Sequence, residues 1–83
     1  MGIAEVRAAF CEAGEGRIFC RGARLMYDHS SGDERQVLEF DGTYDGREFA
    51  IRAPVPPKTD VIVRARQLGC DLVAGLTPKA GDE

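Results

Sequence analysis

The dipeptide Asp45-Gly46 constrains the fold more than any other feature, because it separates two runs in which apolar and polar residues alternate. Asp-Gly tolerates the positive φ angles of a two-residue type I′ turn, so it predicts a tight β-hairpin. Counting outward, the predicted cross-strand pairs are Tyr44 with Arg47, Thr43 with Glu48, Gly42 with Phe49, Asp41 with Ala50, Phe40 with Ile51, Glu39 with Arg52 and Leu38 with Ala53.

This register sorts the side chains of the hairpin onto two different faces. The apolar face holds Leu38, Phe40, Phe49, Ile51 and Ala53, and the polar face holds Glu39, Asp41, Thr43, Glu48 and Arg52. A slip of one residue would put the apolar set in water, so the pattern itself enforces the pairing. We also expect Glu39 and Arg52 to meet as an opposite-charge pair, and the Phe49 ring to lie over Gly42.

The stretch 17–27 predicts a further strand that completes a three-stranded antiparallel meander, but its pattern is less regular. Strict alternation puts Ile18, Cys20 and Met26 on one face and Phe19, Ala23, Leu25 and Tyr27 on the other. The polar loop over 28–34 is too long to fix a register. Both faces of this strand carry apolar groups, so the face that points away from the core exposes some of them. Either a loop or the tail covers these groups, or they form a contact surface for a partner.

A helix is predicted over residues 2–13 and a second helix after residue 60. The first has a helical stripe of Ile3, Val6, Phe10 and Ala13, and Gly14 follows as its stop. In the run Pro54-Val55-Pro56-Pro57 the prolines lack the N–H donor that a sheet needs, so the third strand is expected to stop here and the run predicts an extended connector to the second helix.

The second helix is predicted to begin after a cap at Thr59 or Asp60 and to end at Gly69. Its buried stripe is Val61, Ala65 and Leu68, with Arg64 and Arg66 on the outside. The stretch 70–76 reads either as more helix or as a short buried strand, and the strand is favoured. The fold class is therefore α+β, αβββα or αβββαβ, in one domain over 1–76 with a flexible tail over 77–83.

Composition and size narrow the function classes. A chain of 83 residues builds one modest core without a deep interdomain cleft, which disfavours an elaborate enzyme. The formal net charge of −3 creates no overall attraction to nucleic acid or anionic membranes. Neither a spanning apolar run nor a leader pattern is seen, so a cytoplasmic location is expected.

The cysteines and the histidine do not form a recognisable motif. Cys11, Cys20 and Cys70 contain no Cys-x-x-Cys pair, and their spacing with His29 matches no zinc module. We therefore expect buried, reduced thiols, and no cofactor or metal.

The predicted element order resembles that of the double-stranded RNA-binding module, which is one alternative function. That module grips phosphates with a basic cluster at the start of its second helix. Here the corresponding residues are Lys58, Thr59 and Asp60, so the topology fits better than the motif. A local basic patch could still come from Arg17, Arg21, Arg24, Arg64 and Arg66.

A second alternative is a degenerate minimal metal nuclease, because αβββαβ is also the core order of the PD-(D/E)xK nucleases. Asp41 stands on the second strand, with Glu39 and Glu48 nearby. The third strand carries Ala50 where the second acid is needed and Arg52 where the lysine is needed. This departure disfavours two-carboxylate metal chemistry.

The favoured prediction is a non-catalytic protein–protein interaction module, such as a small inhibitor or adaptor. Small phage-encoded proteins that bind a host protein are an example of this class. Free strand edges and uncovered apolar groups also predict a homodimer. The expected interaction surface comprises Met26, Tyr27, Val37, Glu39, Asp41, Glu48, Arg52, Arg64 and Arg66.

Overall fold

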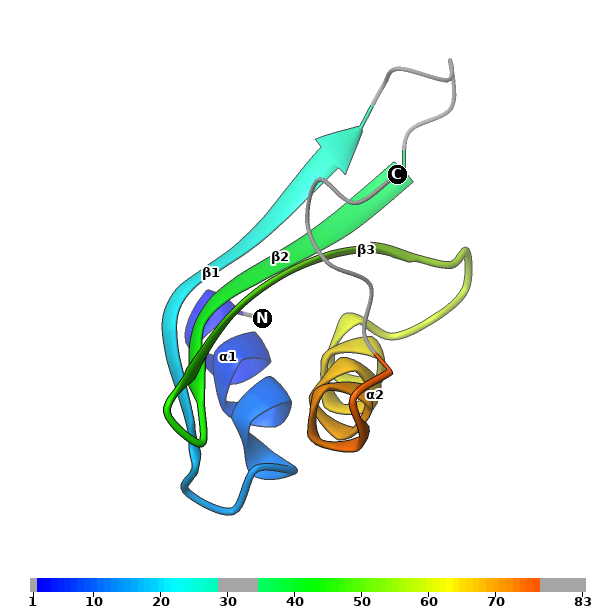
Figure 1. Cartoon of the computed structure of the whole chain (residues 1–83). Helices are drawn as coiled ribbons and strands as arrows, with labels where there is room; N and C mark the ends of the chain where they lie inside the picture. The colour runs from blue at the N-terminus through cyan, green and yellow to red at the C-terminus, as the bar shows by residue number, and fades with distance from the viewer. Residues whose placement is uncertain (1, 29–34, 77–83) are drawn as a thin grey trace.

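The chain folds as a helix, three strands and a second helix, seen in a computed structural model that describes residues 2–28 and 35–76. The elements are α1 (Ile3–Glu12), β1 (Ile18–Asp28), β2 (Arg35–Tyr44), β3 (Arg47–Val55) and α2 (Val61–Ala74). The strands form one antiparallel sheet in the order β1-β2-β3, and both helices lie on the same side of it (Figure 1). The predicted α+β class is confirmed, whereas the predicted tail over 77–83 and the position of His29 lie outside the described residues.

The β2–β3 hairpin confirms the register predicted from its turn. Every pair from Tyr44 with Arg47 to Leu38 with Ala53 is present. The pairing continues to Gln36 with Val55, so the prediction of a connector was wrong for Pro54 and Val55; β3 is an edge strand, where a proline is tolerated. Asp45 and Gly46 adopt the positive φ angles of 52° and 83° that a type I′ turn requires. The predicted ion pair also forms, with Arg52 Nη1 2.6 Å from Glu39 Oε2. The alternation therefore encodes this hairpin locally.

A β-bulge in β1 explains why the pattern of that strand is irregular. Its pairing with β2 shifts between Cys20 and Gly22, which leaves Arg21 as the extra residue. Ile18 and Cys20 face the core before the bulge, and Ala23 and Leu25 face it afterwards. The prediction that strict alternation separates these pairs onto opposite faces was wrong, because a single extra residue inverts the facing of everything that follows.

The core lies between the apolar face of the sheet and the two helices. Phe10 of α1 stacks on Phe40 of β2, with ring centroids 4.0 Å apart and ring planes 3° from parallel. Phe49 of β3 lies against the same Phe10 ring at 5.7 Å. The other buried members of this cluster are Val6, Ala9, Ile18, Leu38, Ile51, Ala53, Val55, Val61, Ala65 and Leu68.

The first helix is slightly shorter than predicted and buries a different stripe. It ends at Glu12, and its buried residues are Val6, Ala9 and Phe10. Ile3 was predicted to lie in the buried stripe, but it remains 40% exposed in the first turn. The Glu5 side chain accepts a hydrogen bond from the Gly2 N–H at 3.1 Å, which satisfies one of the free donors at the helix start.

The second helix corrects two predictions, since it continues through Gly69 and no strand forms within residues 70–76. Helix α2 ends at Ala74, and Gly75 terminates it in the left-handed conformation at φ 77°. Gly69 is buried against α1, where an added Cβ would overlap the carbonyl oxygen of Phe10. Gly69 therefore serves close helix packing, and the helical stretch after it packs Leu72 and Val73 against the core.

The cap of α2 gives a first testable prediction. Asp60 Oδ1 accepts a hydrogen bond from the Ile62 N–H at 2.7 Å, which decides between the two caps predicted from the sequence. We expect Asp60→Ala to lower the free energy of unfolding by about 1 kcal/mol. Thr59→Ala is the matched control and should change it by less than about 0.5 kcal/mol in urea titrations. Equal losses in the two variants would contradict this assignment.

Candidate interaction site

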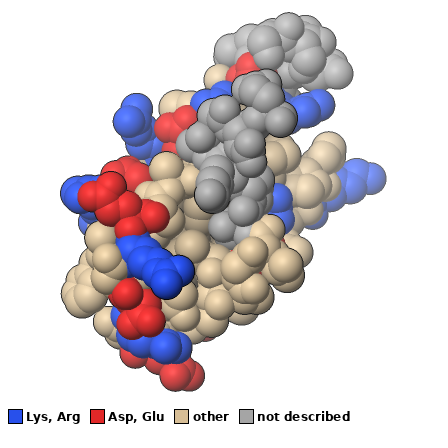
Figure 2. Space-filling view, in the orientation of Figure 1, with Lys and Arg blue, Asp and Glu red and all other residues tan. Residues whose placement is uncertain are grey.

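The predicted acidic sheet face exists, but its charges largely neutralise one another. Glu39, Asp41, Glu48 and Arg52 alternate with buried residues and therefore project from the face that the helices leave open. Arg52 pairs with Glu39 at 2.6 Å, and Arg21 approaches Asp41 at 3.5 Å. Figure 2 shows side chains of both signs gathered along the strand side of the molecule, with few over α2. This face is mixed rather than acidic.

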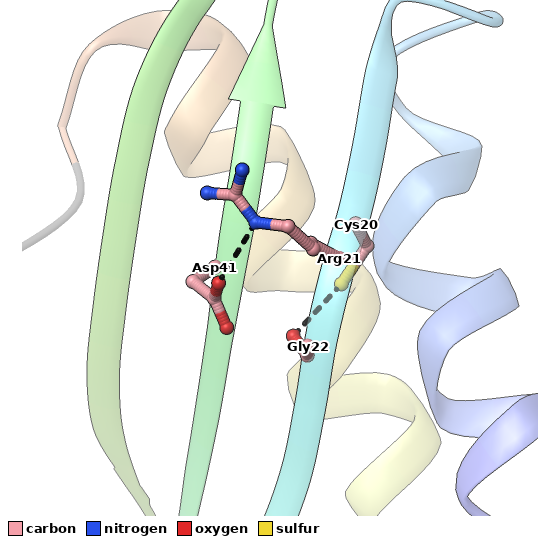
Figure 3. Close-up of polar contacts among 4 residues, drawn as sticks. All are labelled: Cys20, Arg21, Gly22 and Asp41. Carbon is pink, nitrogen blue, oxygen red and sulfur yellow. Dashed lines mark hydrogen bonds and ion pairs between the residues drawn. The ribbon is translucent and has the colours of Figure 1, made fainter.

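The bulge places Asp41 in a crowded position (Figure 3). The Arg21 side chain reaches from β1 across to Asp41 on β2, and the Cys20 thiol donates to the Gly22 carbonyl oxygen at 3.1 Å. An added Cβ at Gly22 would overlap an Asp41 carboxylate oxygen. Within residues 2–28 and 35–76, no group of three or more His, Cys, Asp or Glu side chains could hold a metal ion.

The nuclease alternative also loses its last strand. The PD-(D/E)xK core order needs a strand after the second helix, and residues 70–74 continue that helix instead. Asp41 is moreover paired with Arg21.

The thiols divide into two environments. Cys11 and Cys20 are half-buried, whereas Cys70 is exposed on α2, so the prediction of buried thiols was wrong for Cys70. Burial, reinforced by the nearby Cys11, raises the pKa of Cys20 from 9.0 to about 11, although Arg7 opposes the shift. The folded state therefore holds this proton more tightly, and its contribution to stability is lost as the pH rises from about 9 through 11.

The arginines predicted to form a basic patch are mostly engaged elsewhere. Arg64 donates to the Pro54 carbonyl oxygen at 2.9 Å and to Gln67. Arg66 forms an ion pair with Glu12 of α1 at 3.1 Å. The Arg17 guanidinium lies 5.6 Å from the centre of the Tyr44 ring. Arg64 and Arg66 thus hold α2 against β3 and α1, and they lie on a different element from Arg21 and Arg24.

The three apolar residues of the predicted surface have different environments. Tyr27 is 57% exposed, as expected, and Met26 is half-buried. Val37 is only 4% exposed, so the prediction that it is a surface residue was wrong. The register flanks Val37 with Met26 on one side and Pro54 on the other, and neighbours on both sides reduce its contact with water.

A groove between the start of α1 and the second half of β1 was not predicted from the sequence. Its volume is about 540 Å³, and its lining is mainly apolar. The lining residues are Gly2, Ile3, Val6, Ala23, Arg24, Leu25, Met26, Gln36 and Val61. The groove depends on the bulge, which turns Ala23 and Leu25 toward the helices. The only residue that could have indicated the groove from the sequence was Ile3, an apolar residue at the very start of the helical stripe.

The groove lies beside an unpaired strand edge. β1 is the first strand of the sheet order β1-β2-β3, so within the described residues only β2 pairs with it. An edge strand presents a row of N–H and C=O groups that can pair with another chain. The bulge interrupts this edge near Arg21, and regular pairing with β2 resumes from Gly22 to Asp28. An apolar groove and a regular strand edge therefore run side by side.

Comparisons with known proteins returned no relative. The chain matches no protein-family model, no curated protein and no solved structure. In the part of the chain that the structure describes, neither helix is long and apolar enough to cross a membrane.

Proposed function

We propose that this protein is a non-catalytic interaction module that binds an extended segment of a partner protein as an added strand along β1. The observation that carries this proposal is the apolar groove beside the free edge of β1. In strand addition, the backbone hydrogen bonds of the sheet edge supply affinity, and pockets for alternate side chains supply specificity.

The geometry suits a short segment. The regular edge of β1 after the bulge covers residues 23–28, which is a typical strand length. Side chains of an added strand opposite Ala23 and Leu25 would point toward the helices, because those two residues face the core. They would enter the groove, where Ile3 of α1 forms the opposite wall. The bulge sets one limit of the segment.

A small inhibitor or adaptor is the class of protein that fits such a site, since binding one extended segment needs no catalytic group. We place it in the cytoplasm, and the three free thiols suit a reducing compartment. The nucleic-acid alternative stays a prediction that no contact of the described residues favours, because Arg64 and Arg66 already bind within the chain.

The homodimer predicted from the sequence also stays a prediction, and one register of self-pairing along β1 is unfavourable. An antiparallel pairing of two β1 strands centred between Gly22 and Ala23 would place Arg21 opposite Arg24 of the second copy. Like charges directly opposite each other destabilise such a pair. The exposed Phe19, 68% accessible on the open sheet face, offers self-association another surface.

The site is tested by a substitution in the wall of the groove. Three acetylated six-residue peptides serve as probes, in which valine alternates with threonine, glutamate or lysine. We expect at least one to shift the amide NMR signals of residues 23–27 and of the first turn of α1. Ile3→Glu should weaken that binding at least about tenfold, because a carboxylate then replaces an apolar contact. Val63→Glu is the matched control, since Val63 is a 54% exposed apolar residue of α2 outside the groove lining.

Two results would overturn the proposal. One is that none of the peptides shifts the signals of β1, and the other is that Ile3→Glu and Val63→Glu reduce binding equally. Light scattering over a dilution series tests whether a second copy of the chain occupies the groove. A dimer that Ile3→Glu dissociates would show that a second copy, rather than a different protein, occupies the groove.

A further inference from the structure

The positive charge of Arg24, beside the groove, is not paired with a carboxylate of the described residues. Arg24 is exposed and lines the groove, and its cross-strand neighbour on β2 is Glu39. Glu39 binds Arg52 of β3 instead, at 2.6 Å. Within the described residues, the Arg24 guanidinium forms no ion pair or hydrogen bond. Its positive charge is therefore available to a ligand on the open side of the β1 edge.

A second exposed arginine, Arg7, lies on α1. Arg7 is exposed one helical turn after Ile3, which lines the groove. Its charge reaches Cys20 of β1 and acts to lower the pKa of that thiol, so Arg7 lies on the β1 side of α1. Within residues 2–28 and 35–76, Arg7 has no ion pair either. Arg7 therefore lies on the helix side of the sheet, near Cys20, whereas Arg24 projects from the open side and is the cation that can meet a side chain there.

Few acidic groups lie at the same place, and Asp28, at the far end of the β1 edge, already has an interaction within the chain. None of the described residues that line the groove is Asp or Glu. Glu5 is the nearest carboxylate along α1, and it accepts a hydrogen bond from the Gly2 N–H. Asp41, beyond the bulge, approaches Arg21. The unpaired positive charge of Arg24 contrasts with the net charge of −3 of the whole chain, so it is a local feature.

We propose that the segment bound along β1 is acidic, with Asp or Glu alternating with apolar residues. This inference rests on the proposed strand addition. Arg24 lies between Ala23 and Leu25 and therefore projects to the opposite side of the sheet from them. In an added strand, apolar residues opposite Ala23 and Leu25 enter the groove, and an acidic residue opposite Arg24 meets its guanidinium as a cross-strand ion pair.

The alternating pattern explains why both features occur together. A strand that pairs with an edge turns every second side chain to the same side. The apolar groove on the helix side therefore favours apolar residues at every second position of the bound strand. The unpaired Arg24 on the open side favours acidic residues at the positions between them. A second copy of this chain offers Arg24 only Asp28, in an antiparallel pairing centred on Met26, and Asp28 already interacts within its own chain.

The experiment compares peptides that differ only in charge. The probes are acetylated six-residue peptides in which valine alternates with glutamate, glutamine or lysine, titrated by NMR at low and high salt. We expect the glutamate peptide to bind about tenfold more tightly than the glutamine peptide at low salt, and the lysine peptide most weakly. The preference should shrink as salt screens these exposed charges.

Substitutions then locate the preference. Arg24→Gln should make the glutamate and glutamine peptides bind equally, while the binding of the glutamine peptide stays unchanged. Arg47→Gln is the matched control, because Arg47 is an exposed arginine beside the β2–β3 turn, outside the groove lining. It should leave the preference intact. Thermal melts check that each variant is folded.

The outcomes separate the two proposals. If the glutamate and glutamine peptides bind β1 equally in the unmodified protein, the acidic preference is overturned and strand addition stands. If no peptide binds β1, strand addition itself fails. A preference that survives Arg24→Gln, or that Arg47→Gln abolishes, would place the recognition of charge elsewhere and overturn the inference.

Discussion

Replacing Phe40 with alanine is expected to lower the free energy of unfolding by about 3–5 kcal/mol. Phe40 is 1% exposed and stacks on Phe10 at a centroid distance of 4.0 Å, so its removal leaves a cavity between the sheet and α1. A domain of this length is stable by about 4–12 kcal/mol in total. Urea unfolding followed by circular dichroism should therefore show a large fraction of the stability lost.

Phe19 provides the matched control for Phe40 because it is the same residue type on the open face of the sheet. It is 68% exposed, so we expect Phe19→Ala to change the free energy of unfolding by less than about 0.5 kcal/mol in the monomer. A loss in Phe19→Ala as large as that in Phe40→Ala would mean that the open face is covered in solution. A loss in Phe40→Ala as small as that expected for Phe19→Ala would contradict the core described above.

Replacing Gly69 with alanine is expected to lower the free energy of unfolding by about 2 kcal/mol. In an exposed helix the same change would be stabilising by about 1 kcal/mol, because alanine has the higher helix propensity. Here the added methyl group would overlap the Phe10 carbonyl oxygen and force the two helices apart, which costs about 3 kcal/mol. The melting temperature should fall by roughly 10 °C, as calorimetry would measure.

The sign of the Gly69 effect is the decisive observation. Cys70→Ala, at the exposed neighbouring position of the same helix, should leave the stability nearly unchanged. A melting temperature that rises in Gly69→Ala would show that the helices do not approach each other as described.

The β2–β3 hairpin was predictable from its turn as far as Leu38 and Ala53, because everything that determines this part is local. Asp45 and Gly46 set the turn, and a side-chain period of two leaves only one register that buries Phe40 with Ile51. The open-face charges followed from the same count, including the pair of Glu39 with Arg52. Local turn chemistry and alternation are both written directly in the order of residues.

The faces of β1 and the extent of α2 were not predictable in this way. The bulge at Arg21 lets Cys20 and Ala23 face the same core, and its position depends on how β1 meets β2. Gly69 resembles a helix stop in isolation, whereas its small size serves contact with α1. In both cases a partner that is distant in sequence overrides the local signal.

The sequence by itself determined the order of the first helix and the three strands, the hairpin register and the charged open face, since turn chemistry and periodicity act between near neighbours. Only the tertiary structure decided which side of β1 is buried and where α2 ends. It also decided that Ile3 and Leu25 border one groove beneath a free edge. The candidate site belongs to this second group, because a groove exists only where two elements far apart in the chain are packed together.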